Sequence, residues 1–185
     1  MKHFVFAAGV LLMSATFIHA QEKTTPKVEV GVTYTFVRVN TQQDQNHINE
    51  NGGSASVAYN LNKTFGLVAD FGGYDNGNLD RRQFSYMFGP RLNWRMSRVV
   101  PYVQFLFGGT HEWGTLASTG ESITRTGFAT AAGGGIDINI TRHIAVKPIQ
   151  LEYYMTQLPH LSSGFDSVQN DLRYSAGVVF RFGSK

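Results

Sequence analysis

The sequence predicts an all-β protein, more specifically an eight-stranded antiparallel up-and-down transmembrane β-barrel. Apolar and polar residues alternate in eight segments, and because a strand has a period of two, each segment presents one apolar and one polar face. The connections between these segments are alternately long and short. Beyond the first twenty residues, no stretch approaches the roughly 18 consecutive apolar residues of a membrane-spanning helix.

The N-terminus differs from the rest of the chain. Lys2 and His3 make a short basic start, residues 4–17 are mostly apolar, and Ala20 is small. These features predict a secretory signal peptide cleaved near Ala20-Gln21, because the apolar run is short for a retained membrane anchor. No Pro/Ser-rich linker or long charge run divides the remainder of the chain. We therefore expect a signal peptide at residues 1–20 and a single outer-membrane β-barrel domain at residues 21–185.

The composition limits the possible partners and the source of stability. The net charge is +3, and removal of Lys2 with the signal peptide leaves +2, which is too small and too scattered to indicate nucleic-acid binding. The chain has no cysteine, so it has neither disulfides nor a lipoprotein cysteine. Its stability must therefore come from a backbone hydrogen-bond network that closes on itself.

The first four strands are expected at residues 28–36, 54–61, 65–72 and 84–95. In the fourth, apolar residues occupy every second position from Phe84 to Trp94. Residues 41–52 and 74–82 break the alternation with polar residues and glycine, which predicts long loops. Asn62-Lys63 predicts a tight turn between the second and third strands.

The last four strands are expected at residues 101–108, 128–139, 144–155 and 172–182. They are connected by short turns at 96–99 and 141–143 and by long loops at 111–125 and 157–169. In the seventh strand, the alternation of apolar and polar residues shifts by one position. This slip predicts a β-bulge near Pro148-Ile149, since proline lacks the ladder donor and is found at bulges or edges.

The closing strand shows the expected faces most clearly. Its polar face carries Arg173 and Arg181, and its apolar face consists of Leu172, Tyr174, Ala176, Val178, Phe180 and Phe182. In a transmembrane barrel the apolar face meets lipid and the polar face meets the lumen, with long connections outside the cell and short ones in the periplasm. Aromatic residues of outward parity near strand ends suit the two interfacial girdles: Tyr34, Phe36, Tyr59, Phe65, Phe84, Trp94, Phe180 and Phe182.

A soluble barrel of the lipocalin type would show the same alternation turned inside out. The charged residues on the polar face of the strands distinguish the two kinds of barrel. On a soluble barrel they would be solvated, whereas in a membrane barrel they must pair inside a confined lumen. Four acids face five bases, so we predict a lumen ionic network of Glu29, Asp70, Arg91, Arg95, Asp137, Lys147, Glu152, Arg173 and Arg181.

On these residues the chain resembles the small eight-stranded outer-membrane β-barrel family, the OmpA/OmpX-like barrels, over essentially all of residues 28–182. Residues 88–91, 101–103 and 172–177 look like segments of the porin-family outer-membrane β-barrel domain of Gram-negative bacteria. The resemblance implies location in the cell outer membrane, contact with its lipids and lipopolysaccharide, and assembly by the barrel-assembly machinery. It also implies that Phe180 and Phe182 form the assembly signal, although Gly183-Ser184-Lys185 follow where family members commonly end on the aromatic residue.

Three functions remain open at this point. A structural or surface-interaction role without enzymatic activity is the main expectation. A lipid A-modifying enzyme, a deacylase or acyltransferase, would need a serine, a histidine and an acid in matched geometry. The loose candidates are His111, Glu112, Ser118, Ser122, His160, Ser162, Ser163 and Asp166, without the His-x-Ser-Asn pattern expected of the deacylase family.

The third function is a minor gated pore for small solutes, although eight strands enclose a lumen that side chains fill. A metal site built from His47, His111 and His160 lacks ligand spacing. We therefore expect no cofactor, no metal and no catalytic residue.

Overall fold

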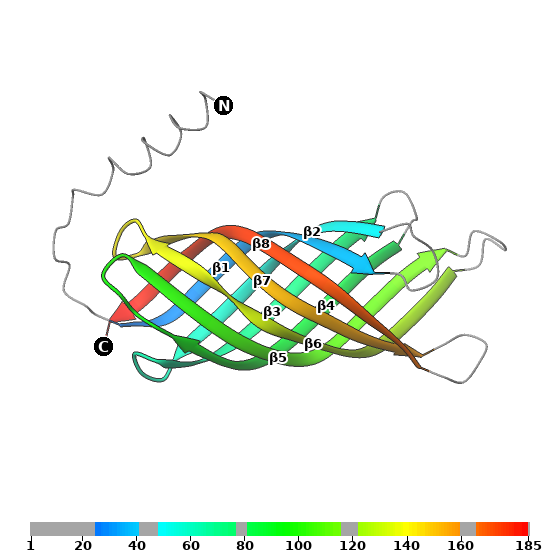
Figure 1. Ribbon diagram of the computed structural model, residues 1–185, viewed down its shortest axis with the longest axis horizontal. Helices are drawn as coiled ribbons and strands as arrows, with labels where there is room; N and C mark the ends of the chain where they lie inside the picture. Colours follow the sequence, from blue (N-terminus) through cyan, green and yellow to red (C-terminus); the bar gives the residue numbers. More distant parts are fainter. Residues whose placement is uncertain (1–24, 41–47, 77–80, 116–121, 160–165, 185) are drawn as a thin grey trace, which may run out of the picture.

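A computed structural model describes residues 25–40, 48–76, 81–115, 122–159 and 166–184 of the chain. Within these ranges it contains eight strands (Figure 1): β1 (Pro26–Asn40), β2 (Ile48–Asn60), β3 (Phe65–Asn76), β4 (Arg81–Asn93), β5 (Val99–Thr115), β6 (Ser122–Asn139), β7 (Ile144–Pro159) and β8 (Asp166–Ser184). The described residues include no helix long and apolar enough to cross a membrane. The predicted signal peptide, residues 1–20, lies outside the described residues.

The eight strands form a closed barrel in sequence order. Each strand pairs antiparallel with the next, and β1 closes the barrel against β8 through pairs such as Val32 with Val178. Closure leaves no strand edge, so every strand has a hydrogen-bonding neighbour on both sides. The predicted fold class is confirmed.

The two ends of the barrel differ, as Figure 1 shows from the side. One end, here named the turn end, carries the start of β1, the end of β8 and the three short turns at 61–64, 94–98 and 140–143. The opposite end, the loop end, carries the other four connections. The connections therefore alternate between the two ends as predicted, but their lengths do not alternate strictly, since 77–80 at the loop end spans four residues and 94–98 at the turn end spans five.

The predicted faces are confirmed by the exposure of the side chains. In β4, Gln83, Ser85 and Met87 are buried, whereas the intervening Phe84 and Tyr86 are each 40% exposed. The exposed face of the barrel is rich in aromatic side chains, and near the turn end these are Tyr59, Phe65, Trp94 and Phe182. The protein thus has an apolar exterior and a mixed polar interior, the reverse of a soluble barrel.

The predicted bulge in β7 is confirmed. The register against β8 shifts between Lys147 and Gln150, and the register of β7 against β6 shifts between Ile136 and Ile138 of β6. Because the bulge adds one residue, Lys147 and Gln150 both point inward although they are three residues apart. The bulge leaves the Pro148 carbonyl free of the ladder, and the Tyr174 hydroxyl donates a hydrogen bond to it at 3.2 Å.

The strands extend further toward the loop end than predicted, so the predicted loop boundaries were wrong. Parts of all four predicted loops, 41–52, 74–82, 111–125 and 157–169, belong to strands. The reason is that both faces of a strand meet water beyond the apolar band, so the alternation ends while backbone pairing continues. At the turn end, β4 stops at Asn93, two residues before the predicted boundary.

Candidate functional site in the barrel lumen

All nine residues of the predicted lumen network have inward-facing side chains. Eight of them are buried, and the side chain of Arg95, beyond the end of β4, is 12% exposed. Eight of the nine divide into two groups along the barrel, and Lys147 lies beside Tyr102 between these groups. We name Asp70, Glu152 and Arg173 the central cluster, and Glu29, Arg91, Arg95, Asp137 and Arg181 the turn-end cluster.

In the central cluster, one arginine holds two carboxylates from opposite sides. Arg173 of β8 donates through Nε to Glu152 Oε2 at 2.7 Å and through Nη1 to Asp70 Oδ1 at 2.9 Å. Its Nη2 lies 2.6 Å from the same Glu152 oxygen. Arg173 is 0% exposed, so the three charges are removed from water and depend on one another.

Neutral polar groups complete the central cluster. Gln104 donates to Glu152 Oε1 and Gln150 donates to Glu152 Oε2, each at 2.8 Å. Arg173 also donates to the Tyr74 hydroxyl at 3.0 Å. Both oxygens of Glu152 are therefore hydrogen-bonded, which is the condition under which a buried charge is tolerated.

Tyr102 of β5 lies between the two clusters. Its hydroxyl donates to Gln150 Oε1 at 2.6 Å, and Lys147 donates to the same oxygen at 2.8 Å. The guanidinium of Arg91 lies 3.6 Å from the centre of the Tyr102 ring, in cation–π contact. The ring covers Gly135 on β6, where a Cβ would lie 2.6 Å from the tyrosine hydroxyl oxygen, so the close packing of this ring requires glycine.

In the turn-end cluster, three arginines share two carboxylates. Arg91 donates to Asp137 at 2.8 Å, and its other terminal nitrogen lies 3.9 Å from Glu29. Arg95 donates to Glu29 at 3.0 Å, and Arg181 Nε lies 3.3 Å from the same Glu29 oxygen. Arg181 also donates to the side-chain oxygen of Asn139. The geometry thus leaves an excess of positive charge at this end.

The sequence analysis did not place three buried acidic residues near the loop end in the lumen: Glu50 of β2, Glu112 of β5 and Asp171 of β8. Glu50 and Glu112 fell inside predicted loops, and Asp171 directly precedes the predicted closing strand. Each continues the inward parity of its strand, so extending the alternation by a few residues would have found them. Nearby, Gln83 donates to Thr110 at 2.7 Å and to the Tyr154 hydroxyl at 3.1 Å.

The loose enzyme candidates do not form a catalytic group in the described part of the chain. His111 is hydrogen-bonded to the Thr126 hydroxyl at 2.5 Å and packs edge-on against Trp113. Its neighbour Glu112 is buried in the lumen, and because adjacent strand residues point to opposite faces, the two cannot act together. Four of the other candidates lie outside the described residues: Ser118, His160, Ser162 and Ser163. Asp166 begins β8, but its side chain is not described.

Metal binding also finds no support among the described residues. They include no group of three or more His, Cys, Asp or Glu side chains that could hold an ion. Of the three histidines considered from the sequence, His47 and His160 lie outside the described ranges.

Phe180 and Phe182, the residues of the implied assembly signal, lie on the outer face near the end of β8. They are 40% and 55% exposed. On β1, Phe180 pairs with Val30 and Phe182 with Val28. Both therefore sit at the seam where the first and last strands close the barrel.

A comparison with protein families finds one match that covers nearly the whole chain. Residues 8–182 match the family described as "Outer membrane protein beta-barrel domain". No curated protein matches the sequence.

Solved structures share the fold at low sequence identity. Neisserial surface protein A superposes with a TM-score of 0.69 at 14% identity, covering 87% of this chain and 100% of that one. Ail, the attachment invasion locus protein of Yersinia pestis, gives a TM-score of 0.58 at 22% identity, covering 85% and 99%, and has also been solved with the heparin analogue sucrose octasulfate. The N-terminal barrel domain of OprF from Pseudomonas aeruginosa gives 0.55 at 16% identity, covering 85% and 100%.

Proposed function

This chain belongs to the outer membrane protein beta-barrel domain family and is an outer-membrane protein, and from that premise we propose that it is a rigid, non-enzymatic scaffold that presents surface loops to an extracellular partner. The observation that carries the proposal is the packed, charge-paired lumen beneath four connections gathered at one end. A rigid scaffold that displays loops is the usual arrangement for recognition.

The proposal fixes an orientation. The turn end, with its three short turns, faces the periplasm, and the loop end faces the outside, as is usual for barrels of this kind. The exposed aromatic and aliphatic face lies in the bilayer between them, in contact with phospholipid on the inner side and lipopolysaccharide on the outer side.

Packing of the lumen favours a scaffold over a pore. Met87, Leu106, Tyr154 and Arg173 point inward from four different strands, and each is 0% exposed. Because water does not reach these side chains, they fill the lumen at this level, as expected for a barrel of eight strands. Solute passage would require these side chains to move together with the buried ion pairs of the central cluster.

The similar structures are compatible with a surface role. Ail carries attachment and invasion in its name and was solved with a heparin analogue. For this chain we propose only the general role, recognition at the loop end, because the identity with these structures is low.

The test is replacement of the four loop-end connections, residues 41–47, 77–80, 116–121 and 160–165, by short Gly/Ser linkers. Bacteria expressing the full chain should adhere to immobilised host-cell matrix, and the loop variant should lose that adhesion while its band remains heat-modifiable on gels. A His111→Ala variant should adhere like the unmodified protein. Lipid A mass spectra should be the same with and without expression.

Two results would overturn the proposal. Full adhesion after replacement of all four loops would remove the recognition role from the loop end. Loss or addition of an acyl chain on lipid A, abolished by His111→Ala, would make the protein an enzyme.

We also propose that the barrel-assembly machinery recognises β8 through Phe180 and Phe182. Their place at the closing seam supports this role, because β8 must be held in place until β1 pairs with it. Replacing both residues by Ala should reduce the outer-membrane yield several-fold, measured by immunoblot of membrane fractions. Replacing the equally exposed Phe88 and Phe105 by Ala is the control, and equal yields for the two double variants would reject the signal.

A further inference from the structure

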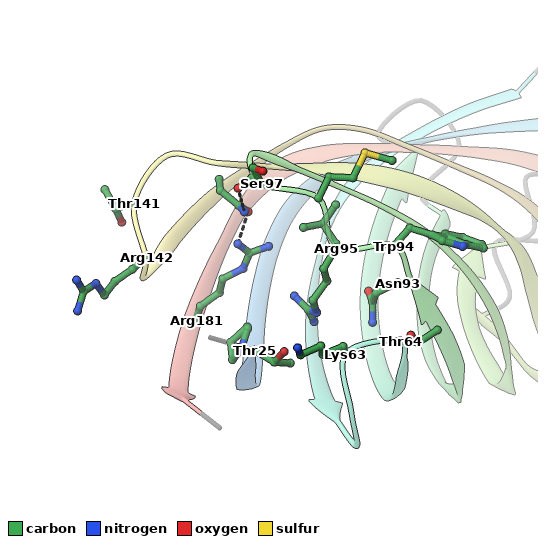
Figure 2. A pocket seen from close by; sticks show the side chains of 14 residues that line it. Thr25, Lys63, Thr64, Asn93, Trp94, Arg95, Ser97, Thr141, Arg142 and Arg181 are labelled. Atoms are coloured by element: carbon green, nitrogen blue, oxygen red, sulfur yellow. Dashed lines mark hydrogen bonds between the residues drawn. The ribbon is translucent and has the colours of Figure 1, made fainter. Parts of the chain in front are cut away.

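A cavity of about 490 Å³ opens at the turn end, within the mouth of the barrel (Figure 2). It is lined by side chains from the short turns and from the ends of the strands, among them Lys63, Arg95, Ser97, Arg142 and Arg181. In Figure 2, Arg142 extends away from the others, so it lies at the rim. Nothing in the proposed recognition role at the loop end uses this cavity.

Every charged side chain that lines the cavity is a cation: Lys63, Arg95, Arg142 and Arg181. The three short turns, residues 61–64, 94–98 and 140–143, contain no aspartate or glutamate. The nearest acid inward is Glu29, which three arginines already share. The cavity is therefore a positively charged space without a protein anion of its own.

Two guanidinium groups at the floor of the cavity have spare donors. Arg181 is only 5% exposed, and its Nη2 makes no hydrogen bond within the described ranges. The same is true of Nε and Nη2 of Arg95. Among the described residues, Glu29 Oε2 and Asn93 Oδ1 nearby also lack a partner, but these two acceptors are fewer than the open guanidinium donors. Buried polar groups are usually satisfied, so the surplus of donors beside the cavity points to a missing acceptor.

We propose that this turn-end cavity binds a phosphate group. A guanidinium presents a planar fork of donors that matches phosphate oxygens, and an ammonium such as Lys63 adds a point charge. The Thr64 hydroxyl, which also lines the cavity, can donate to a remaining oxygen. The volume is large enough for a phosphate or pyrophosphate with several waters. In the orientation proposed above, such a group would come from the periplasm or from the headgroup of an inner-leaflet phospholipid.

The experiment is calorimetric titration of the refolded full chain with inorganic pyrophosphate, in a non-ionic detergent without phosphate and at low salt. We expect saturable one-to-one binding that weakens as salt is added. Ser97→Glu places a carboxylate at the cavity wall and should weaken binding at least about tenfold. The uncharged Ser97→Gln, of nearly the same size, should bind like the unmodified protein.

Two further variants separate a site from general surface charge. Lys63→Gln should weaken binding roughly fivefold, whereas Arg82→Gln, which removes one cation at the loop end, should have no effect. Because Lys63 and Ser97 are exposed, these variants should fold, and each is checked by its heat-modifiable mobility. Absence of saturable binding, or equal losses in Ser97→Glu, Ser97→Gln and Arg82→Gln, would overturn the proposal.

The source of the phosphate is distinguished by a second arm. The protein is placed in nanodiscs of pure phosphatidylcholine, or with one quarter phosphatidylglycerol or phosphatidic acid, and pyrophosphate is titrated again. Competition by the anionic lipids, lost in Ser97→Glu, would identify a lipid headgroup as the source. Unchanged pyrophosphate binding in all three nanodiscs would identify a soluble phosphate compound.

Discussion

The central and turn-end clusters use the same residue types in opposite proportions. In the central cluster, two carboxylates surround Arg173, and all three side chains are buried. In the turn-end cluster, three arginines surround two carboxylates, and Arg95 reaches the cavity at the barrel mouth. With Lys147, which donates to Gln150 beside Glu152, the central cluster has as many cations as carboxylates, whereas the turn-end cluster has one cation more than carboxylates.

The difference indicates what each group contributes. Charges in the middle of a narrow lumen must be balanced by neighbouring charges of opposite sign, because no water is available to solvate an excess charge. At the mouth of the barrel, an excess of positive charge can be tolerated because water or a bound anion can accept hydrogen bonds from the extra guanidinium donors. We therefore expect mutations in the central cluster to change mainly stability, and mutations at the mouth to change stability less and anion binding more.

The largest effect is expected for Arg173→Met. This variant leaves Asp70 and Glu152 buried without their shared cation, and breaking a buried pair by removing one partner costs about 3–5 kcal/mol. The free energy of unfolding is measured by urea titration of the protein in lipid vesicles. The variant Arg173→Met with Asp70→Asn and Glu152→Gln should recover part of the loss. A loss below about 1 kcal/mol for Arg173→Met would show that the carboxylates are not held by this arginine.

A smaller loss is expected for Arg91→Leu. Glu29 keeps Arg95 and Arg181, but Asp137 loses the donor at 2.8 Å, so the cost is about 2–3 kcal/mol. The barrel should still insert, and its gel band should lose heat-modifiability at a lower temperature than that of the unmodified protein. Unchanged resistance to heat in detergent would count against a stabilising role of the turn-end pairs.

Glu29→Gln should move stability and anion binding in opposite directions. Loss of the shared carboxylate should lower the free energy of unfolding by about 1–2 kcal/mol, because Arg95 and Arg181 lose their ion pair. It should also raise pyrophosphate affinity severalfold, since the cavity becomes more positive. The same titration and calorimetry measure both, and a parallel decrease in both would remove the distinction between the clusters.

The smallest effect is expected outside the lumen. Arg82 and Asp75 form an ion pair of 3.5 Å between side chains that are 70% and 57% exposed. Exposed pairs contribute about 0–1 kcal/mol, so Arg82→Gln should shift the urea midpoint hardly at all. A loss as large as that of Arg91→Leu would mean that burial does not decide the strength of these pairs.

The sequence predicts most of the fold because alternate residues of a strand point to its two faces, so the apolar and polar faces can be assigned from the sequence. Phe84, Tyr86 and Phe88 fall on the outer face, as their parity predicts, and the slip of parity in β7 locates the bulge. The loop-end strand boundaries are not predicted, since Ile48–Gly53 of β2 and His111–Thr115 of β5 pair through their backbone without an apolar face.

The residues that face the lumen could be predicted from the sequence, but the ion pairs that they form there could not. Parity alone places Arg91 and Asp137 inside the barrel. That Arg91 binds Asp137 while Arg173 binds Asp70 depends on the stagger of the strands and on side-chain conformations across the lumen, which parity does not contain. The cavity could not be predicted for the same reason, because it is assembled from three turns and the ends of five strands.

The bulge in β7 makes this strand a junction of two half-strands of opposite phase. Deletion of one residue at Pro148 or Ile149 would remove the bulge and bring both halves into one regular alternation, with Lys147 and Gln150 two residues apart and both still facing the lumen. A single-residue deletion is therefore less damaging here than elsewhere in β7, where it would turn the lumen side of part of the strand toward lipid.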